Sequence, residues 1–118
     1  PDDIFDCIEN GADTFDCVSP ARVGRNGALY THFGRKNITH SRYREQFSAF
    51  DEDCDCYTCQ NFSAAYLHHL FRSKELLAKT LATIHNERFI VRLVDDIRRS
   101  IDDGSFYEHK QRFLADYY

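Results

Sequence analysis

The sequence predicts an α/β fold that becomes mostly helical in its second half. A short helical segment at residues 1–11 is followed directly by a strand-like segment at residues 13–18, and this order is the repeating unit of a parallel α/β sheet. From residue 65 onward, apolar residues recur at helical spacing. With 118 residues and 42% hydrophobic composition, the chain is long enough for one domain with a modest core.

The first helix is predicted from residues 1–3, because proline suits a first helical turn and the two aspartates favour the positive end of the helix dipole. Gly11 is expected to end it. Alternating polar and apolar residues over 13–18 predict the strand, and Pro20 stops it.

Glycines divide the next part of the chain. Gly24 and Gly27 predict a flexible loop. The following segments, 28–33 and 36–39, are rich in strand-forming residues and are joined around Gly34, so a β-hairpin is expected there.

Three helices are predicted after the cysteine-rich segment. Residues 65–71 form the first, and Ser73 is expected to cap the junction with the second. The second, residues 74–103, is the longest element and ends at Gly104. Residues 105–117 form the last helix, which begins with a capping-box sequence. The apolar face of the long helix is predicted to comprise Leu77, Leu81, Ile84, Ile90, Leu93, Val94, Ile97 and Ile101.

Charge is unevenly distributed along the chain, although the net charge is only −4. Residues 1–17 carry six acidic residues and no Lys or Arg, whereas residues 20–46 carry six Lys or Arg against one Glu. A local surplus of positive charge of this kind is compatible with binding to phosphates, and equally with a solvated basic face.

Three cysteines within the segment Cys54-Asp55-Cys56-Tyr57-Thr58-Cys59 predict a metal site. An iron–sulfur ligand set and free thiols are the alternatives. Spacing leaves the fourth ligand open among His68, His69 and His85, although the first two lie beside leucines and are more typical of structural histidines. Three cysteines and one histidine would close the zinc coordination shell, so the site is expected to be structural.

Catalytic residues are sought at the carboxyl end of the predicted strand. Asp16 lies there, where parallel α/β folds place reactive residues, although aspartates in such places commonly serve as caps. Cys17 has no identifiable base nearby, and burial is expected for it.

The cysteine count and the distribution of apolar residues indicate the cellular compartment of the protein. Five cysteines are an odd number that does not suit a secreted disulfide framework, and no apolar run reaches the roughly 20 residues that a membrane span needs. No charged, apolar leader precedes the first acidic residues. We therefore expect a cytoplasmic protein with reduced thiols and no membrane association.

Five segments spread over nearly the whole chain match one known family in order and spacing. They are Asp13-Thr14-Phe15-Asp16-Cys17-Val18-Ser19-Pro20-Ala21-Arg22, Arg25-Asn26-Gly27, Cys54-Asp55-Cys56-Tyr57-Thr58-Cys59, Ala65-Tyr66-Leu67-His68-His69-Leu70 and Thr83-Ile84-His85-Asn86. By these segments the chain resembles the tRNA-guanine transglycosylases, and bacterial members most closely. One departure is Ser19-Pro20-Ala21, where the family usually has a bulky apolar residue followed by Pro-Thr.

The resemblance implies exchange of the wobble guanine of tRNA for a 7-deazaguanine in queuosine biosynthesis. By this resemblance Asp16 is the nucleophile, which forms a covalent bond to the ribose, and Arg22 and Arg25 contact the anticodon loop. It also implies one structural zinc ion per chain. Its ligands would be Cys54, Cys56, Cys59 and His85.

The resemblance further implies the C-terminal portion of a TIM (β/α)8 barrel with an inserted zinc-binding subdomain, and a homodimer. Residues 1–26 would be the last barrel helix–strand unit with the catalytic loop, residues 27–85 the hairpin and zinc-binding subdomain, and residues 86–118 the closing barrel helix and the C-terminal helix. A barrel typically needs about 250 residues, so the chain corresponds to the C-terminal third of such an enzyme. Alone it is expected to be inactive.

Two other functions remain open at this point. A non-catalytic, zinc-stapled module for RNA binding or dimerisation would keep its RNA affinity when Asp16 is replaced. A purely structural zinc domain would be indifferent to replacement of Arg22 and Arg25, apart from the change in surface charge.

Overall fold

A computed structural model describes residues 1–12 and 19–117, in which helices predominate and one helix of 28 residues, α5 (Leu76–Asp103), spans most of the length. The molecule is elongated, with extents of 45 × 24 × 23 Å. Along the chain the other elements are α1 (Asp2–Glu9), α2 (Ser19–Arg25), β1 (Ala28–Thr31), β2 (Gly34–Asn37), the 3-10 turn η1 (Ser41–Tyr43), α3 (Tyr57–Asn61), α4 (Ala64–Arg72) and α6 (Phe106–Tyr117). The strand predicted over residues 13–18 lies outside the described residues.

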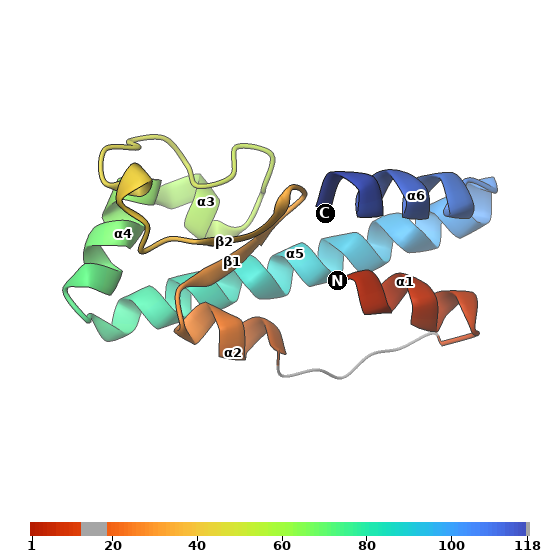
Figure 1. Cartoon of the computed structure of the whole chain (residues 1–118), viewed down its shortest axis with the longest axis horizontal. Coiled ribbons are helices and arrows are strands. Elements are labelled where there is room, and N and C mark those ends of the chain that lie inside the picture. The colour runs from red at the N-terminus through yellow and green to blue at the C-terminus, as the bar shows by residue number, and fades with distance from the viewer. Residues whose placement is uncertain (13–18, 118) are drawn as a thin grey trace.

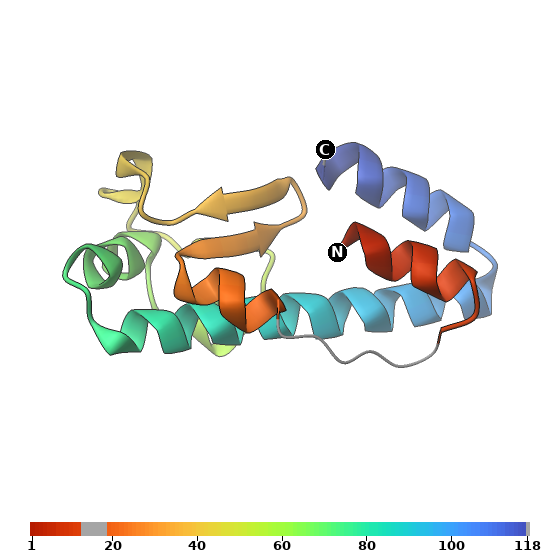
Figure 2. The ribbon, with the colours of Figure 1, turned by 60° about the horizontal axis from the view of Figure 1, so that its bottom comes forward.

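Helix α5 is the support on which two groups of elements pack (Figures 1 and 2). Helices α2, α3 and α4 and the hairpin lie along its N-terminal half, whereas α1 and α6 lie along its C-terminal half. The Lys110 ammonium of α6 pairs with the carboxylates of Asp6 and Glu9 on α1, which ties the second group together. No helix among the described residues combines the length and the apolar character that a membrane span requires.

The β-hairpin is confirmed, with a first strand shorter than predicted and a second strand that begins at Gly34, two residues earlier than predicted. Strands β1 and β2 are antiparallel, and Thr31 pairs with Gly34, so His32 and Phe33 form the two-residue turn. Gly34 has a φ of +104°, which only glycine adopts without strain, and a Cβ there would lie 3.0 Å from the Tyr117 carbonyl oxygen. The hairpin tip is therefore held closely against the end of α6.

The loop predicted around Gly24 is instead helical, because Gly24 lies buried within α2. A Cβ at this position would lie 3.2 Å from the backbone nitrogen of Thr83 and 3.3 Å from the carbonyl carbon of Ala82. The glycine is thus used for close approach of α2 to the backbone of α5, and not for flexibility. Gly27 does turn the chain, with a φ of +85°.

Asn86 is the fully buried residue that connects three elements. Its side-chain oxygen accepts a hydrogen bond from the Tyr30 backbone N–H at 3.0 Å. Its side-chain nitrogen donates to the carbonyl oxygens of Ala28, at 2.9 Å, and Pro20, at 3.1 Å. One amide of α5 therefore hydrogen-bonds backbone groups of both β1 and α2.

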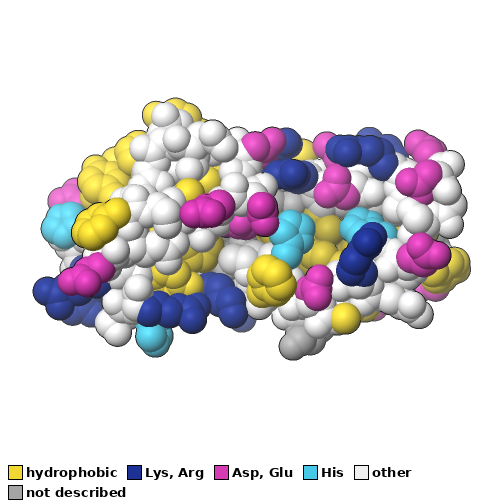
Figure 3. All heavy atoms as spheres, turned by 90° about the horizontal axis from the view of Figure 1, so that it is seen from above, with side chains coloured by type: hydrophobic (Ala, Val, Ile, Leu, Met, Phe, Trp, Pro, Cys, Tyr) yellow, Lys and Arg dark blue, Asp and Glu magenta, His cyan; other side chains and the backbone are white. Residues whose placement is uncertain are grey.

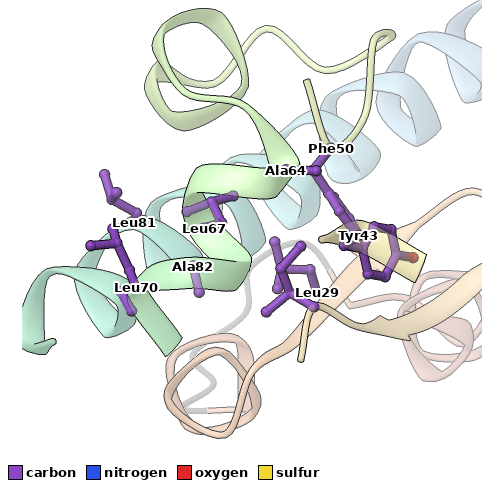
Figure 4. Packing of buried hydrophobic residues seen from close by; sticks show 10 residues of the cluster. Leu29, Tyr43, Phe50, Ala64, Leu67, Leu70, Leu81 and Ala82 are labelled. Atoms are coloured by element: carbon purple, nitrogen blue, oxygen red, sulfur yellow. The ribbon is translucent and has the colours of Figure 1, made fainter. Parts of the chain in front are cut away.

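The hydrophobic core is divided along α5 in the same way as the elements. Figure 4 shows side chains from the hairpin, α4 and the first turns of α5 converging in one cluster. Aromatic residues dominate the second cluster, between α1, β1, α5 and α6. The first cluster comprises Leu29, Ile38, Tyr43, Phe50, Ala64, Leu67, Leu70, Ala78, Leu81 and Ala82, and the second Phe5, Tyr30, Phe89, Leu93, Ile97 and Phe113.

The buried face of α5 differs from the predicted one. Leu77 and Ile101, which were expected to be buried, are 45% and 52% exposed. The buried stripe instead contains His85, Asn86 and Ser100, which an apolar pattern cannot detect. The predicted end of the helix is confirmed, since Gly104 is its left-handed C-cap with a φ of 81°.

Replacing Asn86 by alanine is expected to destabilise the zinc-loaded chain by about 3 kcal/mol, because three hydrogen bonds to the backbone, two of them buried, are lost. Urea denaturation followed by circular dichroism measures the change. Asn61→Ala is the control, since the Asn61 amide donates only to the Tyr57 carbonyl on an exposed helix, and a loss within about 0.5 kcal/mol is expected. Equal effects of the two variants would contradict the bridging role.

Candidate metal centre

The four predicted metal ligands converge beneath the first half of α5. Cys54 and Cys56 lie on the loop before α3, Cys59 lies within α3, and His85 projects from α5. His85 is fully buried, and each cysteine is at most 8% exposed. The four donor atoms all lie within 4.8 Å of one another. Packing of α3 on α5 thus brings His85 to the cysteines, of which Cys59, 26 positions earlier, is the nearest in sequence.

The distances fit one tetrahedral ion. The Nδ1 atom of His85 lies 3.5 Å from the sulfur of Cys54, 3.7 Å from that of Cys56 and 3.3 Å from that of Cys59. Zinc–sulfur and zinc–nitrogen bonds of about 2.3 and 2.1 Å at a tetrahedral angle place sulfur and nitrogen about 3.5 Å apart. The observed cage therefore has the size of a zinc site. An iron–sulfur cluster would hold its ligands farther apart, which argues against that alternative.

The ring of His85 is oriented by the hairpin. Its Nε2 atom lies 2.7 Å from the backbone carbonyl oxygen of Tyr30, so Nε2 carries the proton and donates it. This leaves the lone pair on Nδ1, the nitrogen that faces the sulfurs. The edge of the Phe50 ring covers the imidazole, with ring centroids 5.6 Å apart. An acceptor on the far nitrogen is the usual way in which a protein fixes the tautomer of a metal-binding histidine.

The cysteine segment is held in place by hydrogen bonds of its own. The backbone N–H of Cys56 donates to the sulfur of Cys54 at 3.5 Å, and that of Cys59 donates to the sulfur of Cys56 at 3.3 Å. Thr58, buried between them, donates its hydroxyl to the Leu81 carbonyl oxygen of α5 at 2.7 Å. The N–H donors favour thiolate over thiol, and the threonine fixes α3 on α5.

A salt bridge attaches the same loop to α5 on its outer side. The guanidinium of Arg88, one turn after His85, donates to both carboxylate oxygens of Asp55 at 2.8 and 2.9 Å. These hydrogen bonds hold the pKa of Asp55 at about 2, so the pair stays charged at neutral pH. Arg92 donates to the Asp53 carbonyl oxygen at 2.8 Å. An exposed ion pair adds little stability by itself, but a bidentate one restricts the loop geometry.

The sulfurs are electrostatically suited to a cation. Hydrogen bonds from the Cys54 and Cys59 thiols hold the pKa of Cys56 at about 3, so one thiolate is present near neutral pH. Hydrogen bonds with Cys54 and Cys56 raise the pKa of Cys59, which keeps its proton as long as no cation is present. A divalent ion bound by three thiolates would displace the remaining protons. With four protein ligands the shell has no position for water, so the site serves structure and not catalysis.

The other predicted site residues are placed as follows. Asp16 lies outside the described residues. Arg22 and Arg25 are both exposed on α2, one turn apart. His68 is buried with its Nδ1 atom 2.9 Å from the Ile38 carbonyl oxygen, as expected for a structural histidine, and His69 is exposed. Sequence analysis did not identify the Asp55–Arg88 pair, because an aspartate and an arginine 33 residues apart carry no local signal.

Mutation of the cluster is expected to remove zinc selectively. The wild-type chain should retain one zinc ion after dialysis against a competing chelator, whereas Cys59→Ser and His85→Gln should lose it, because three ligands cannot close the shell. Elemental analysis of the dialysed protein measures the ratio. The controls are Cys7→Ser, which replaces an exposed free thiol, and His69→Gln, which replaces an exposed imidazole. Zinc loss from either control would show that the ligand set is wrong.

Comparison with known proteins agrees with this site. Residues 1–118 match the family described as queuine tRNA-ribosyltransferase. The chain is 49% identical over 117 residues to the queuine tRNA-ribosyltransferase of Dictyoglomus turgidum, and 48% identical over 114 residues to that of Aquifex aeolicus. It is 47% identical over 118 residues to that of Caldanaerobacter subterraneus subsp. tengcongensis.

These alignments cover 99%, 97% and 100% of this chain, but only 30%, 30% and 32% of the three relatives. The chain therefore spans just under a third of the length of the curated relatives that it matches. Within the described residues, the one cluster of potential metal ligands is the buried zinc site of three cysteines and one histidine. The chain belongs to the queuine tRNA-ribosyltransferase family.

Proposed function

We propose that this chain forms the nucleophile-bearing, zinc-binding part of an enzyme that exchanges the wobble guanine of tRNA for a 7-deazaguanine. The observation that carries the proposal is similarity of 47–49% identity over nearly the whole chain to enzymes named queuine tRNA-ribosyltransferase. The chemistry is a double displacement at the anomeric carbon of the ribose. The enzyme would act in the cytoplasm, where tRNA is modified.

In this proposal Asp16 is the nucleophile. Its carboxylate forms a bond to the anomeric carbon while the bond from that carbon to guanine breaks, and guanine leaves as its N9 nitrogen takes up a proton. The deazaguanine then forms a bond from its N9 nitrogen to the same carbon, its N9 proton is released, and the ester bond to Asp16 breaks, so the original configuration is restored. The ribose can be reached only when the target nucleotide is turned out of the anticodon loop.

Helix α2 would contact the RNA. It begins at Ser19, three residues after Asp16, and exposes Arg22 and Arg25 on successive turns. Its position on α5 is fixed by the close approach at Gly24 and by the Asn86 hydrogen bond to Pro20. Guanidinium groups held in this way, six and nine residues after Asp16 in the sequence, suit the phosphates or bases of the anticodon loop.

The zinc ion would act as a structural link in this arrangement. Its ligand His85 donates to the Tyr30 carbonyl, and β1 continues the chain from α2. The remainder of a TIM barrel, including most of the base-binding pocket, would be supplied by the part of the enzyme that this chain does not span. We also propose a homodimer that uses the exposed aromatic side chains beside the zinc site, Tyr57 and Tyr66, which pack on Phe62.

Guanine exchange tests the catalytic role of Asp16. The zinc-loaded chain and a chimera, in which this chain replaces the matching third of a bacterial relative, are incubated with tRNA and labelled guanine. The chimera is expected to incorporate label and the chain alone to incorporate none, because the chain does not supply the base pocket. Asp16→Ala should abolish incorporation by the chimera, whereas Asp3→Ala, on the exposed face of α1, should not. Incorporation by the Asp16→Ala chimera would refute the assigned nucleophile.

The RNA contact of α2 is tested separately from chemistry. Replacing Arg22 and Arg25 together by glutamine in the chimera should weaken binding of an anticodon stem–loop about tenfold at 0.1 M salt, because two cationic contacts are lost. Filter binding gives the affinity. The matched control is Arg98→Gln with Arg99→Gln, two exposed arginines of α5 far from α2. Unchanged RNA affinity would leave a purely structural zinc domain as the better description.

A further inference from the structure

A second group of basic side chains surrounds an open hollow between η1 and α4, remote in sequence from α2. The hollow has a volume of about 510 Å³. Figure 3 shows Lys and Arg side chains along one edge of the half that carries the hairpin and α4, whereas acidic and basic side chains are interspersed over the other half. We call the hollow the basic pocket, and its lining residues are Ser41, Arg44, Ala65, His68, His69 and Arg72.

The positive charge of the basic pocket is uncompensated. None of its lining residues is acidic, and within residues 1–12 and 19–117 no carboxylate lies within 4 Å of the guanidinium of Arg44 or Arg72. By contrast, the ammonium of Lys110 and the guanidinium of Arg88 each have a carboxylate partner. The two free guanidiniums come from different elements, η1 with its following turn and the last turn of α4. The helix dipole favours a cation such as Arg72 in the last turn of α4. It does not account for Arg44, which lines the same pocket from another element.

One wall of the basic pocket is rigid. The His68 side chain is only 7% exposed, and its Nδ1 atom donates to the Ile38 carbonyl oxygen at 2.9 Å. That hydrogen bond fixes the ring, which forms a rigid wall of the pocket and leaves Nε2 as an acceptor. Ser41, also in the lining, adds a hydroxyl that can donate. The pocket thus combines two exposed guanidiniums and a hydroxyl with one rigid wall.

We infer that the basic pocket binds a backbone phosphate of the RNA substrate, at a point separate from the nucleotides contacted by α2. This inference rests on the proposed function for the identity of the RNA. Two guanidiniums and a hydroxyl supply several hydrogen-bond donors, which match the several oxygens of a phosphodiester. Such a contact carries no sequence information, but it fixes the orientation of the RNA relative to the nucleophile.

Replacing Arg44 and Arg72 together by glutamine tests the inference in the chain and in the chimera. Both side chains are exposed and make no described hydrogen bond, so the fold should persist. Binding of an anticodon stem–loop RNA at 0.1 M salt should weaken about tenfold, and the dependence of log affinity on log salt should become shallower by about 1–2. The control, Arg98→Gln with Arg112→Gln, makes the same charge change on exposed sites elsewhere and should leave the affinity within about twofold.

A second measurement examines the phosphate contact without RNA. Titration of the zinc-loaded chain with inorganic phosphate should shift the side-chain nitrogen resonances of His68 in the wild type and not in the Arg44→Gln, Arg72→Gln variant. Equal RNA affinity of this variant and its control would overturn the inference, even if guanine exchange proceeds. A phosphate shift without an RNA effect would also overturn it, and would assign the pocket to free phosphate. Selective loss of RNA affinity in a chimera that does not exchange guanine would uphold the pocket and reject the proposed chemistry.

Discussion

Two neighbouring residues of α5 form hydrogen bonds to the backbone N–H and C=O of Tyr30, and the arrangement of the other elements depends on this contact. Asn86 accepts from the Tyr30 N–H, and His85 donates to its carbonyl oxygen. In the register of the hairpin, the backbone N–H and C=O of Tyr30 point away from β2. Side chains of α5 bond these two groups, as a further strand of a sheet would otherwise do. Because the same two side chains also reach the zinc site and Pro20, one point on α5 sets the positions of the cysteine loop, the hairpin and α2.

This contact suggests how a closed metal site would matter to the proposed RNA-modifying enzyme without taking part in the reaction. The zinc ligands are buried and leave no position for water, whereas the cations proposed to contact RNA lie on α2 and around the basic pocket. Zinc would therefore act by holding those elements to one another. The loop that carries the ligands is attached to α5 from two sides, by the metal and by the Asp55–Arg88 pair.

Local signals in the sequence predicted the local features. The cysteine spacing predicted the metal site, strand-forming segments on either side of Gly34 predicted the hairpin, and Gly104 predicted the end of α5. Features that depend on tertiary contacts were missed. Gly24 was interpreted as a loop residue, because its use in close helix packing depends on α5, about 60 residues later. Likewise, Asn86 was not among the predicted buried residues of α5, because its burial depends on hydrogen bonds to backbone groups of β1 and α2.

The most direct test of this account is amide hydrogen exchange with and without zinc. If the His85–Tyr30 contact couples the metal to the rest of the fold, chelation should increase exchange in β1 and α2 together with the cysteine loop. Amides of α6 and of the C-terminal half of α5, which pack in the separate aromatic cluster, should retain most of their protection. Loss of protection confined to the cysteine loop, with α2 and β1 unchanged, would contradict the account, since zinc would then stabilise only its own loop.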